Sequence, residues 1–369
     1  MSESPLRVAI IGCGRITGHH ARCIAQVDGA EVVAVCDKIE EKAAAYGREF
    51  SVPYFLDYHR MLRDVPQANT VVVAVPSGMH FEYAVELLKD YRKHVIVEKP
   101  TFLRPSQLRE AYALAEELGL HVFPVFQNRY NRAVRRTRRA LLEGDLGALR
   151  IAAVRVRWCR PQRYYDLAAW RGTWAQDGGA LTNQGIHHVD LLRHLGGEID
   201  CVSATMRTLG AQIEVEDTVV ATMRFASGAV GVLEVTTSAR PNDFEASISL
   251  VCEKGLAQIG GIAVNELQVF TPDPSACAEW SEDFSDIIYG KGHRETYKDL
   301  VAFFREGRPY PVSREDCLRS LKLLHAFYRS DEAGGAWVDT DGDGESTRLG
   351  RPDEELAKLY RTSPPKATP

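Results

Sequence analysis

The segment Val8-Ala-Ile-Ile-Gly12-Cys-Gly14-Arg-Ile-Thr17 decides how the first third of this chain is expected to fold. Its apolar start predicts a buried strand, and the two glycines after it predict a tight turn into a helix. Such a turn lets the backbone approach a pyrophosphate, which the free N–H groups of the helix N-terminus bind. The third glycine of the usual pattern is replaced by Thr17, and Gly18 follows. The segment predicts a dinucleotide-binding turn with one departure from that pattern.

The residue that follows the second apolar run indicates which dinucleotide binds. Asp37 comes directly after Val32-Val-Ala-Val-Cys36, where a carboxylate can accept hydrogen bonds from the adenosine ribose. A 2′-phosphate would meet a like charge there, so NAD is favoured, while Lys38 keeps NADP open. The alternative is a structural glycine turn beside a surface aspartate. The residues expected to bind NAD around this turn are Gly12, Gly14, Arg15, Ile16, Asp37 and Lys38.

Periodicity divides the chain into two folded parts and a tail. Up to residue 126, short β-branched runs alternate with amphipathic stretches, which is typical of a parallel sheet covered on both faces. Later segments, such as 152–158 and 219–225, alternate with period two, and helical patterns occupy 294–306 and 314–329. We expect an α/β protein: a doubly wound nucleotide-binding domain at 1–126, an α/β domain with a largely antiparallel open sheet at 127–338, and a loosely docked tail at 339–369.

Composition excludes several classes of protein. The 369 residues are 45% hydrophobic and carry a net charge of −5, so we expect a globular protein that binds neither nucleic acid nor membranes. No apolar run approaches the roughly 20 residues of a membrane span, and the N-terminus shows no secretory signal, so a cytoplasmic location is expected. The eight cysteines lack metal-ligand spacing, and we predict no metal site. Asp339, Asp341 and Asp343 resemble the start of a calcium loop, but we predict a solvated loop.

Two further segments bring together residue types that suit proton transfer. Glu98-Lys99-Pro100 follows the fourth apolar run, at the sheet edge where ligands of such domains bind. The second segment runs from Gly178-Gly179 to Asp190. Within and after it, residues spaced by four, three and four are expected to share one helical face, and these are Asn183, His187, Asp190 and His194. A structural role for the histidine is the alternative to a catalytic one.

These motifs, with Pro76-Ser77, His80 and Trp170-Arg171, resemble the glucose–fructose oxidoreductase, inositol dehydrogenase and rhizopine-catabolism family over about residues 6–330. The resemblance implies a Rossmann domain, a second domain whose open sheet often mediates oligomerisation, and NAD-dependent chemistry at a sugar or cyclitol carbinol. Asn183 stands where the family commonly has Asp, which puts a carboxylate-assisted relay there in doubt. The further cofactor contacts that we expect are Pro76, Ser77, His80, Glu98, Lys99, Gln127, Trp170 and Arg171.

A narrower resemblance concerns the substrate. The segments 127–131, 158–165, 169–174, 215–218 and 252–255 are similar to UDP-N-acetylglucosaminuronate and UDP-N-acetylglucosamine 3-dehydrogenases. This implies oxidation of a C3 hydroxyl, with the uronate favoured, and a homodimer or homotetramer. It also implies delivery of the 3-keto product to a PLP-dependent aminotransferase in surface polysaccharide or lipid A synthesis. The alternatives are a dehydrogenase of a free sugar, inositol or sugar phosphate, an NAD-dependent glycosidase, and a non-catalytic NAD sensor.

Chemistry suggests a role for each candidate. His187 is favoured as the base, because an ordinary pKa of about 6.5 leaves it largely neutral, and Lys99 as the group that holds the substrate oxygen. The reverse assignment stays open. Arginine side chains suit a diphosphate, although the arginines of 131–143 are also typical of a solvated helix face. The residues expected to bind substrate are Lys99, Arg129, Arg160, Arg163, Tyr165, Asn183 and His187.

Overall fold

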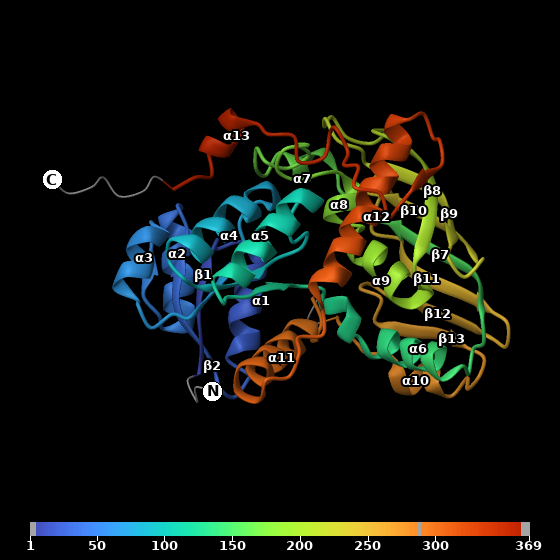
Figure 1. The fold of residues 1–369 in the computed structure, drawn as a ribbon, viewed down its shortest axis with the longest axis horizontal. Helices are drawn as coiled ribbons and strands as arrows, with labels where there is room; N and C mark the ends of the chain where they lie inside the picture. The colour runs from blue at the N-terminus through green and yellow to red at the C-terminus, as the bar shows by residue number, and fades with distance from the viewer. Residues whose placement is uncertain (1–4, 286–288, 363–369) are drawn as a thin grey trace.

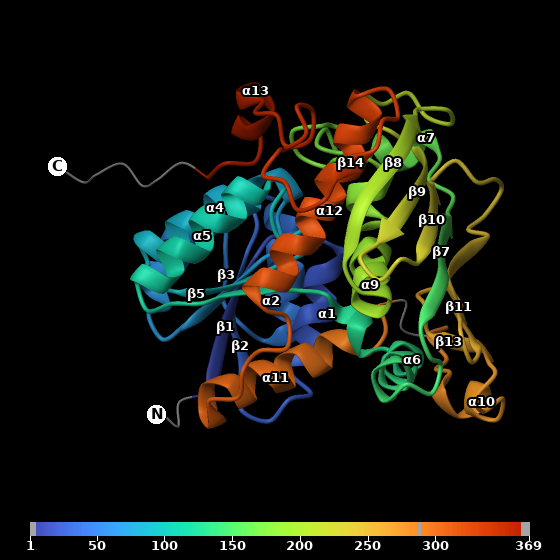
Figure 2. The same ribbon diagram turned by 45° about the vertical axis from the view of Figure 1, so that its right-hand side comes forward.

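The computed structural model describes residues 5–285 and 289–362, which form two lobes side by side (Figures 1 and 2). The first lobe is a six-stranded sheet in the order β3-β2-β1-β4-β5-β6, with every pair parallel. The strand order reverses beside β1, so the crevice between β1 and β4 is where such a sheet binds a ligand. The strands are β1 (Leu6–Ile11), β2 (Ala30–Cys36), β3 (Tyr54–Phe55), β4 (Thr70–Val73), β5 (His94–Val97) and β6 (Val122–Pro124).

Helices cover both faces of this sheet, as the nearly continuous apolar strands require. In Figure 1, α4 and α5 lie above the strands and α11 lies below them. The prediction of a doubly wound first domain is confirmed, although the short strand β3 and helix α3 had no clear signal in the sequence. The helices contributed by the first part of the chain are α1 (Arg15–Ile24), α2 (Glu40–Phe50), α3 (Tyr58–Asp64), η1 (Ser77–Met79), α4 (His80–Lys89) and α5 (Pro105–Glu117).

The second lobe contains an eight-stranded sheet in the order β13-β12-β11-β7-β10-β9-β8-β14. All its pairs are antiparallel except β7 with β10, so the sheet is mixed. The predicted hairpins describe neighbouring strands only, and they carry no information on the long connection that places β7 beside β10. The strands are β7 (Leu149–Arg157), β8 (Ile199–Arg207), β9 (Thr218–Phe225), β10 (Val230–Thr236), β11 (Glu245–Cys252), β12 (Leu256–Gly260), β13 (Glu266–Phe270) and β14 (Val338–Asp339).

Helices α6, α9 and α12 pack on one face of this sheet, and the other face is open. Ala152, Val154 and Val156 of β7 are buried beneath the helices, whereas Val220 and Val232 are exposed on the open face. The helices and turns of the rest of the chain are η2 (Gln127–Tyr130), α6 (Arg132–Glu143), α7 (Gln162–Tyr165), α8 (Ala180–Asn183), α9 (Ile186–Gly196), α10 (Ala276–Trp280), α11 (Gly292–Glu306), α12 (Arg314–Glu332) and α13 (Glu354–Lys358).

Helix α11 returns to the first lobe. Its Tyr297 and Leu300 are fully buried in one cluster with Val8 and Ile10 of β1. The predicted boundaries at 126/127 and 338/339 therefore place in the second domain a helix that completes the core of the first. Periodicity recognises a helix, but it does not show which sheet the helix covers.

The expectation of a loosely docked tail is wrong for the described residues up to 362. Leu349 is fully buried, and Ala357 of α13 joins the main core cluster. The Tyr83 hydroxyl donates to the Tyr360 carbonyl at 2.8 Å. Asp343, one of the aspartates that resemble a calcium loop, pairs with Lys322 at 3.2 Å. The glycine- and aspartate-rich composition hid these contacts, because they form with residues far away in the sequence.

Candidate active site

The glycine turn after β1 has the geometry that a pyrophosphate needs. Gly12 has φ = +95°, and a Cβ there would collide with the Ala74 carbonyl, so only glycine fits. Gly14 is the N-cap of α1, and a Cβ built on it meets no described atom within 4 Å. Arg15 and Ile16 form the first turn of α1. The free N–H groups of α1 therefore face open space, which suits a bound phosphate.

Thr17 explains the departure from the usual glycine pattern. Its hydroxyl donates to the carbonyl of Gly12 and so closes the turn from within. Close helix packing, the usual role of the third glycine, falls one residue later, because a Cβ on Gly18 would lie 2.9 Å from the ring of Tyr46. The turn therefore keeps the function of the three-glycine pattern with a different third residue.

Asp37 and Lys38 lie beyond the end of β2. Asp37 accepts hydrogen bonds from the backbone N–H groups of Cys13, at 2.7 Å, and Ile39, at 2.8 Å. Its carboxylate thus lies against the glycine turn, where an adenosine ribose would bind. Lys38 instead donates to the carbonyl oxygens of Leu359, at 3.2 Å, and Arg361, at 2.6 Å. These bonds hold the ammonium group of Lys38 against the C-terminal tail.

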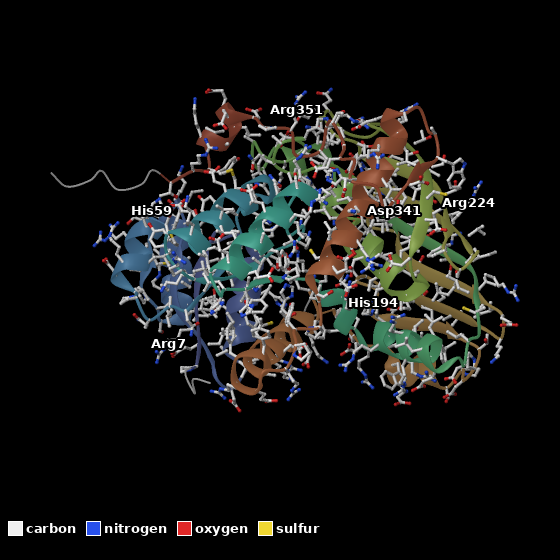
Figure 3. All side chains as sticks on the ribbon, in the orientation of Figure 1. Arg7, His59, His194, Arg224, Asp341 and Arg351 are labelled. Atoms are coloured by element: carbon white, nitrogen blue, oxygen red, sulfur yellow. The ribbon has the colours of Figure 1, made fainter. Side chains whose placement is uncertain are left out.

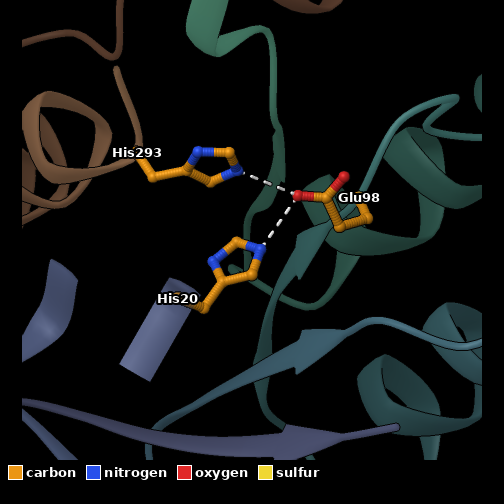
Figure 4. A group of neighbouring side chains, drawn as sticks. All are labelled: His20, Glu98 and His293. Carbon is orange, nitrogen blue, oxygen red and sulfur yellow. Dashed lines mark hydrogen bonds and ion pairs between the residues drawn. The ribbon is translucent and has the colours of Figure 1, made fainter. Parts of the chain in front are cut away.

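Glu98 is the centre of a buried cluster at the end of β5 (Figure 4). Its Oε1 faces Nε2 of His20 at 2.9 Å and Nε2 of His293 at 3.2 Å, and its Oε2 accepts from the Lys99 backbone N–H at 3.0 Å. Burial opposes ionisation, but the hydrogen bonds from both histidines hold the pKa of Glu98 well below its ordinary value. The sequence predicted Glu98 as a cofactor contact, and it gave no signal for either histidine.

The Glu98 cluster also has the composition of a metal site. Among the described residues, His20, Glu98 and His293 form the one group whose ligand atoms all lie within 4.8 Å of one another. Hydrogen bonds already occupy those atoms, and Nδ1 of His20 bonds the Tyr297 hydroxyl at 2.7 Å. We therefore assign the cluster to hydrogen bonding between α1, β5 and α11.

The segment between β4 and α4 is tied to the loop after Glu98. The buried ring of His80 lies between the carbonyls of Val75, at 3.0 Å, and Pro100, at 2.9 Å. Ser77 is buried and Pro76 is partly exposed beside it. His80 therefore fixes the two loops that border the crevice, and the predicted cofactor contacts of Pro76, Ser77 and His80 stay predictions.

Lys99 reaches from the first lobe into the second. Its Nζ donates to the carbonyl oxygen of Asn183 at 2.8 Å. Burial lowers the pKa of Lys99, while the nearby carboxylates of Glu98 and Asp177 favour its charged form. The side-chain amide of Asn183 in turn donates to Asp177. Lys99, Asn183 and Asp177 thus form a chain of contacts across the two lobes.

Asp177 is a site residue that the sequence reasoning missed. It is buried, and it accepts a hydrogen bond from the Gly172 N–H at 2.7 Å. Burial raises its pKa to about 6, although hydrogen bonds from Gly172 and Asn183 oppose that shift. Asp177 also lines a small cavity with Tyr164 and Asn183. Its place directly before Gly178-Gly179 was a usable signal.

His187 lies in the first turn of α9 and faces Gln127. Its Nε2 is 3.1 Å from the side-chain amide of Gln127, and its Nδ1 has no partner among the described residues. Burial lowers the pKa of His187 to about 3, and the charge of Lys99 acts in the same direction. The charge of Lys99 thus acts on His187 although the two residues come from different lobes, and burial keeps His187 neutral at physiological pH.

The predicted continuous face from Asn183 to His194 is wrong. Asn183 ends the short helix α8, and α9 begins at Ile186, so two separate helices carry the motif. Gly185 is the N-cap of α9 and interrupts the spacing. His194, labelled in Figure 3, lies two turns beyond His187 and is only partly buried. Spacing alone treats the segment as one helix, whereas the glycine divides it.

Arg129 does not present its guanidinium to open space. Its Nε and Nη2 donate to the two carboxylate oxygens of Asp190 at 2.7 and 2.6 Å, and its Nη1 donates to Asp316 at 3.2 Å. Burial works against this charge, but Asp190 and Asp316 more than compensate and raise the pKa of Arg129. The expected diphosphate contact at Arg129 is corrected: the buried carboxylate of Asp190 and the partly exposed carboxylate of Asp316 already engage this side chain.

The remaining substrate candidates gather around α7. Arg160 donates to Asp243 at 2.9 Å, and its guanidinium stacks over the ring of Trp158. Arg163 is exposed on α7. The hydroxyl of Tyr165 is hydrogen-bonded to Thr237 at 2.9 Å, within the second lobe. Arg160 and Arg163 are thus the predicted phosphate-binding arginines that are not engaged by a buried carboxylate.

Trp170 and Arg171 lie beside this group. The guanidinium of Arg171 stacks on the Trp170 ring, 4.5 Å from its centre, and donates to the Tyr164 hydroxyl at 2.6 Å. The backbone N–H of Trp170 donates to the hydroxyl of Tyr360 in the tail at 3.1 Å. The tail therefore contacts both lobes beside the crevice, through Tyr83 and Trp170. The cofactor contact expected for Trp170 and Arg171 stays a prediction.

Among the described residues, no helix is both long and apolar enough to cross a bilayer.

Comparisons with solved structures agree with this geometry. The WlbA dehydrogenase from Bordetella pertussis, crystallised with NADH and UDP-GlcNAcA, is 35% identical, with a TM-score of 0.85 over 92% of this chain and 99% of that one. The WlbA dehydrogenase from Chromobacterium violaceum, in complex with the same two compounds, is also 35% identical, with a TM-score of 0.83 over 92% and 97%.

Curated proteins of similar sequence act on simpler compounds. The D-glucoside 3-dehydrogenase of Escherichia coli K12 is 29% identical over 90% of this chain and 97% of its own length. The myo-inositol 2-dehydrogenase of Thermotoga maritima is 26% identical over 89% and 96%.

Two family models match the two halves of the site. Residues 6–126 match the oxidoreductase family with an NAD-binding Rossmann fold, and residues 134–258 match the GFO/IDH/MocA C-terminal domain. The glycine turn, Asp37 and the open N-terminus of α1 suit NAD, which is the cofactor of the matched domain. The chain belongs to the GFO/IDH/MocA family of NAD-dependent oxidoreductases.

Proposed function

We propose that this protein oxidises the C3 hydroxyl of a UDP-N-acetylamino sugar to the 3-keto sugar nucleotide, with NAD as the acceptor and UDP-N-acetylglucosaminuronate as the favoured substrate. The observation that carries the proposal is the bond that Lys99 of the first lobe donates to the Asn183 carbonyl of the second, four residues before His187, whose pKa the charge of Lys99 lowers. The similarity to WlbA dehydrogenases crystallised with UDP-GlcNAcA supports the substrate class.

The roles of the two residues follow from their charge. A charged Lys99 stabilises the negative charge that develops on the substrate oxygen, and Glu98 and Asp177 favour that charged form. His187 is neutral and has an unpartnered ring nitrogen, so it accepts the hydroxyl proton. NAD, when bound, takes the hydride. The reverse assignment, with a neutral Lys99 as the base, is favoured by the burial that lowers the pKa of Lys99.

The substrate diphosphate is assigned to Arg160 and Arg163. Both lie in or beside α7, and Arg129 is already bound by Asp190 and Asp316. Arginine pairs with phosphate through a planar fork of donors, so two arginines on one segment suit a diphosphate. The carboxylate of a uronate would need a further cation, which we assign to an arginine of a neighbouring subunit. A homo-oligomer and a downstream PLP-dependent aminotransferase remain part of this proposal.

A second candidate is 3-oxidation of a simple glucoside. It is favoured by the 29% identity to a D-glucoside 3-dehydrogenase that aligns over nearly its full length. The same pair, Lys99 and His187, would serve both substrates, since a C3 hydroxyl is oxidised in each. The two candidates differ in the need for Arg160 and Arg163.

The test is formation of reduced nicotinamide, followed by its absorbance, with NAD and one of four compounds. These are UDP-N-acetylglucosaminuronate, UDP-N-acetylglucosamine, a methyl glucoside and myo-inositol, each with and without the coupled aminotransferase. We expect the uronate to give the highest kcat/KM, and Arg163→Ala to lower that value without changing the rate on the methyl glucoside. Preference for the methyl glucoside or myo-inositol, with no effect of Arg163→Ala, would refute the UDP-sugar assignment.

A further inference from the structure

Gln127 and His187 form a buried pair in which one polar atom of each side chain has no hydrogen-bond partner among the described residues. The side chains meet at 3.1 Å between the amide of Gln127 and Nε2 of His187. Gln127 Oε1 and His187 Nδ1 are buried, and neither has a partner among the residues that the structure describes. Buried polar atoms in native proteins nearly always have partners, so two orphaned atoms in one pair indicate a ligand or a mechanism that uses them.

Two independent contacts hold this pair in place. Arg129, two residues after Gln127, binds Asp190, one turn after His187, through two hydrogen bonds of 2.6 and 2.7 Å. A second helix packs against the Gln127 backbone, because a Cβ on Gly292 of α11 would collide with the Gln127 carbonyl. The turn η2 is therefore linked to α9 through Arg129 and packed against α11 at Gly292, and these contacts fix the backbone position of Gln127 beside His187.

The chemistry of the pair decides which atom of the amide faces the ring. A half-turn of the terminal amide of Gln127 exchanges its oxygen and nitrogen, so the hydrogen bond to His187 has to be considered in both arrangements. If the nitrogen faces His187, it donates to Nε2, the ring hydrogen sits on Nδ1, and no lone pair is left. If the oxygen faces His187, it accepts from Nε2–H, and Nδ1 keeps a free lone pair.

We infer that Gln127 is a positioning residue that fixes the tautomer of His187: its Oε1 accepts the Nε2–H, so Nδ1 is the atom that accepts the hydroxyl proton of the substrate. This rests on the proposed function, in which His187 is the base, because only this orientation leaves the free lone pair on Nδ1 that a base needs. In the reaction the O–H bond breaks, its proton moves to Nδ1, and the hydride leaves for NAD. The resulting imidazolium keeps its Nε2–H bonded to Gln127 and later releases the Nδ1 proton to solvent.

The arrangement also assigns the second orphaned atom. With Oε1 turned to His187, the amide nitrogen of Gln127 takes the position that has no partner among the described residues. That N–H group is then a free donor at the crevice, which suits a carbonyl or hydroxyl oxygen of the bound compounds. Gln127 therefore connects the ligand side of the crevice with the protonation of His187.

The test uses the full-length protein with bound NAD, with histidine labelled by 15N. Long-range nitrogen–proton correlations show which ring nitrogen carries the hydrogen, and His187→Gln identifies the His187 signals, with His188→Gln as the assignment control. Gln127→Glu keeps an acceptor but loses the donor, and Gln127→Met keeps the length and loses both. We expect the Nε2–H tautomer in the unsubstituted protein and in Gln127→Glu, and a mixture of tautomers in Gln127→Met.

Turnover provides the second readout. Gln127→Met should lower kcat at least about tenfold, a part of the usual contribution of a positioned acid–base group. Gln127→Glu should keep more of its kcat than Gln127→Met, with a raised KM because the amide donor is lost, and the acid limb of its pH profile should move to higher pH, because a carboxylate favours the imidazolium.

Three results would overturn the inference. The first is an Nδ1–H tautomer in the unsubstituted protein, and the second is a switch to that tautomer in Gln127→Glu. The third is a Gln127→Met variant that keeps its tautomer and kcat but has a raised KM for NAD, which would make Gln127 a cofactor contact alone. Failure of the proposed function looks different: the Nε2–H tautomer would be present, yet no sugar nucleotide would yield reduced nicotinamide.

Discussion

Two of the buried ionisable side chains of helix α9, His187 and Asp190, lie one turn apart in opposite surroundings. Both oxygens of Asp190 accept from Arg129, and Oδ1 also accepts from Ser320 at 2.9 Å. His187 has one contact, to Gln127, and its Nδ1 has no partner among the described residues. A saturated carboxylate has nothing left to offer a ligand, whereas an unsaturated imidazole does. The difference indicates that Asp190 has a structural role in the site and that His187 is available for contact with a ligand.

The largest effect, on the free energy of unfolding, should come from breaking the pair of Arg129 and Asp190. Arg129→Met leaves Asp190 buried without its cation, and loss of one partner of a buried pair costs about 3–5 kcal/mol. Denaturant unfolding measures the change in the free energy of unfolding. The double variant Arg129→Met with Asp190→Leu should recover part of the loss. A loss below about 1 kcal/mol, with a raised KM for the sugar nucleotide, would return Arg129 to the diphosphate site.

Substitutions of His187 or Lys99 should mainly affect turnover rather than stability. His187→Gln or Lys99→Met should lower kcat at least about a hundredfold, the usual contribution of a positioned acid–base group. His187→Gln should change the free energy of unfolding by less than about 1 kcal/mol, since it leaves no buried charge unpaired. Lys99→Met should cost more, because it removes the donor to the Asn183 carbonyl and a charge that favours the ionised form of the buried Asp177. The matched control is His188→Gln, the next residue on α9, which should keep kcat. Near-normal turnover in either site variant would remove that residue from the mechanism.

The buried histidines and Asp190 of α9 should also affect the free energy of unfolding over different pH ranges. Burial lowers the pKa of His187 to about 3 and of His188 to about 4, so both are neutral in the folded state. The unfolded chain protonates them near pH 6.5, so their stabilising effect is complete above about pH 6.5 and is lost as the pH falls toward 4. The pKa of Asp190 is held low by Arg129 against the effect of burial, so its loss comes only below about pH 4.

The pH prediction is tested by following the free energy of unfolding from pH 7.5 to 4. Each buried neutral histidine should contribute a slope of up to about 1.4 kcal/mol per pH unit in that window. His188→Phe should reduce the slope, because it removes one group that protonates on unfolding and keeps a ring beside Trp158. An unchanged slope would mean that His188 binds protons equally in the folded and unfolded states, so that burial does not lower its pKa.

The smallest effect is expected at an exposed ion pair, which sets the lower end of the comparison. Arg361 in the tail binds Glu82 and Glu354, each at 2.6 Å, and all three side chains are more than a third exposed. Arg361→Ala should cost about 0.2–1 kcal/mol, and the cost should shrink in high salt. Thermal unfolding at low and high salt measures it. A loss that salt leaves unchanged would show that the tail is held by packing rather than by this charge.

Local patterns carried much of the fold and part of the site. The β-branched runs predicted strands β1, β2, β4 and β5, because a strand covered on both faces must be apolar along its length. The glycine turn identified the cofactor end, since φ = +95° at Gly12 excludes other residues. Lys99 and His187 were found because each directly follows a recognisable element.

Other features depend on contacts that no local pattern encodes. Arg129 and Asp190 are 61 residues apart, and Glu98 lies 195 residues from His293, so neither pairing leaves a periodic signal. Helix α11 was recognised as a helix, but only packing showed that it covers the first sheet. Residue type and spacing thus determine local backbone conformation, through sterics and burial. Which buried charge finds a partner, and which is left free for chemistry, is decided only when distant segments pack together and exclude water.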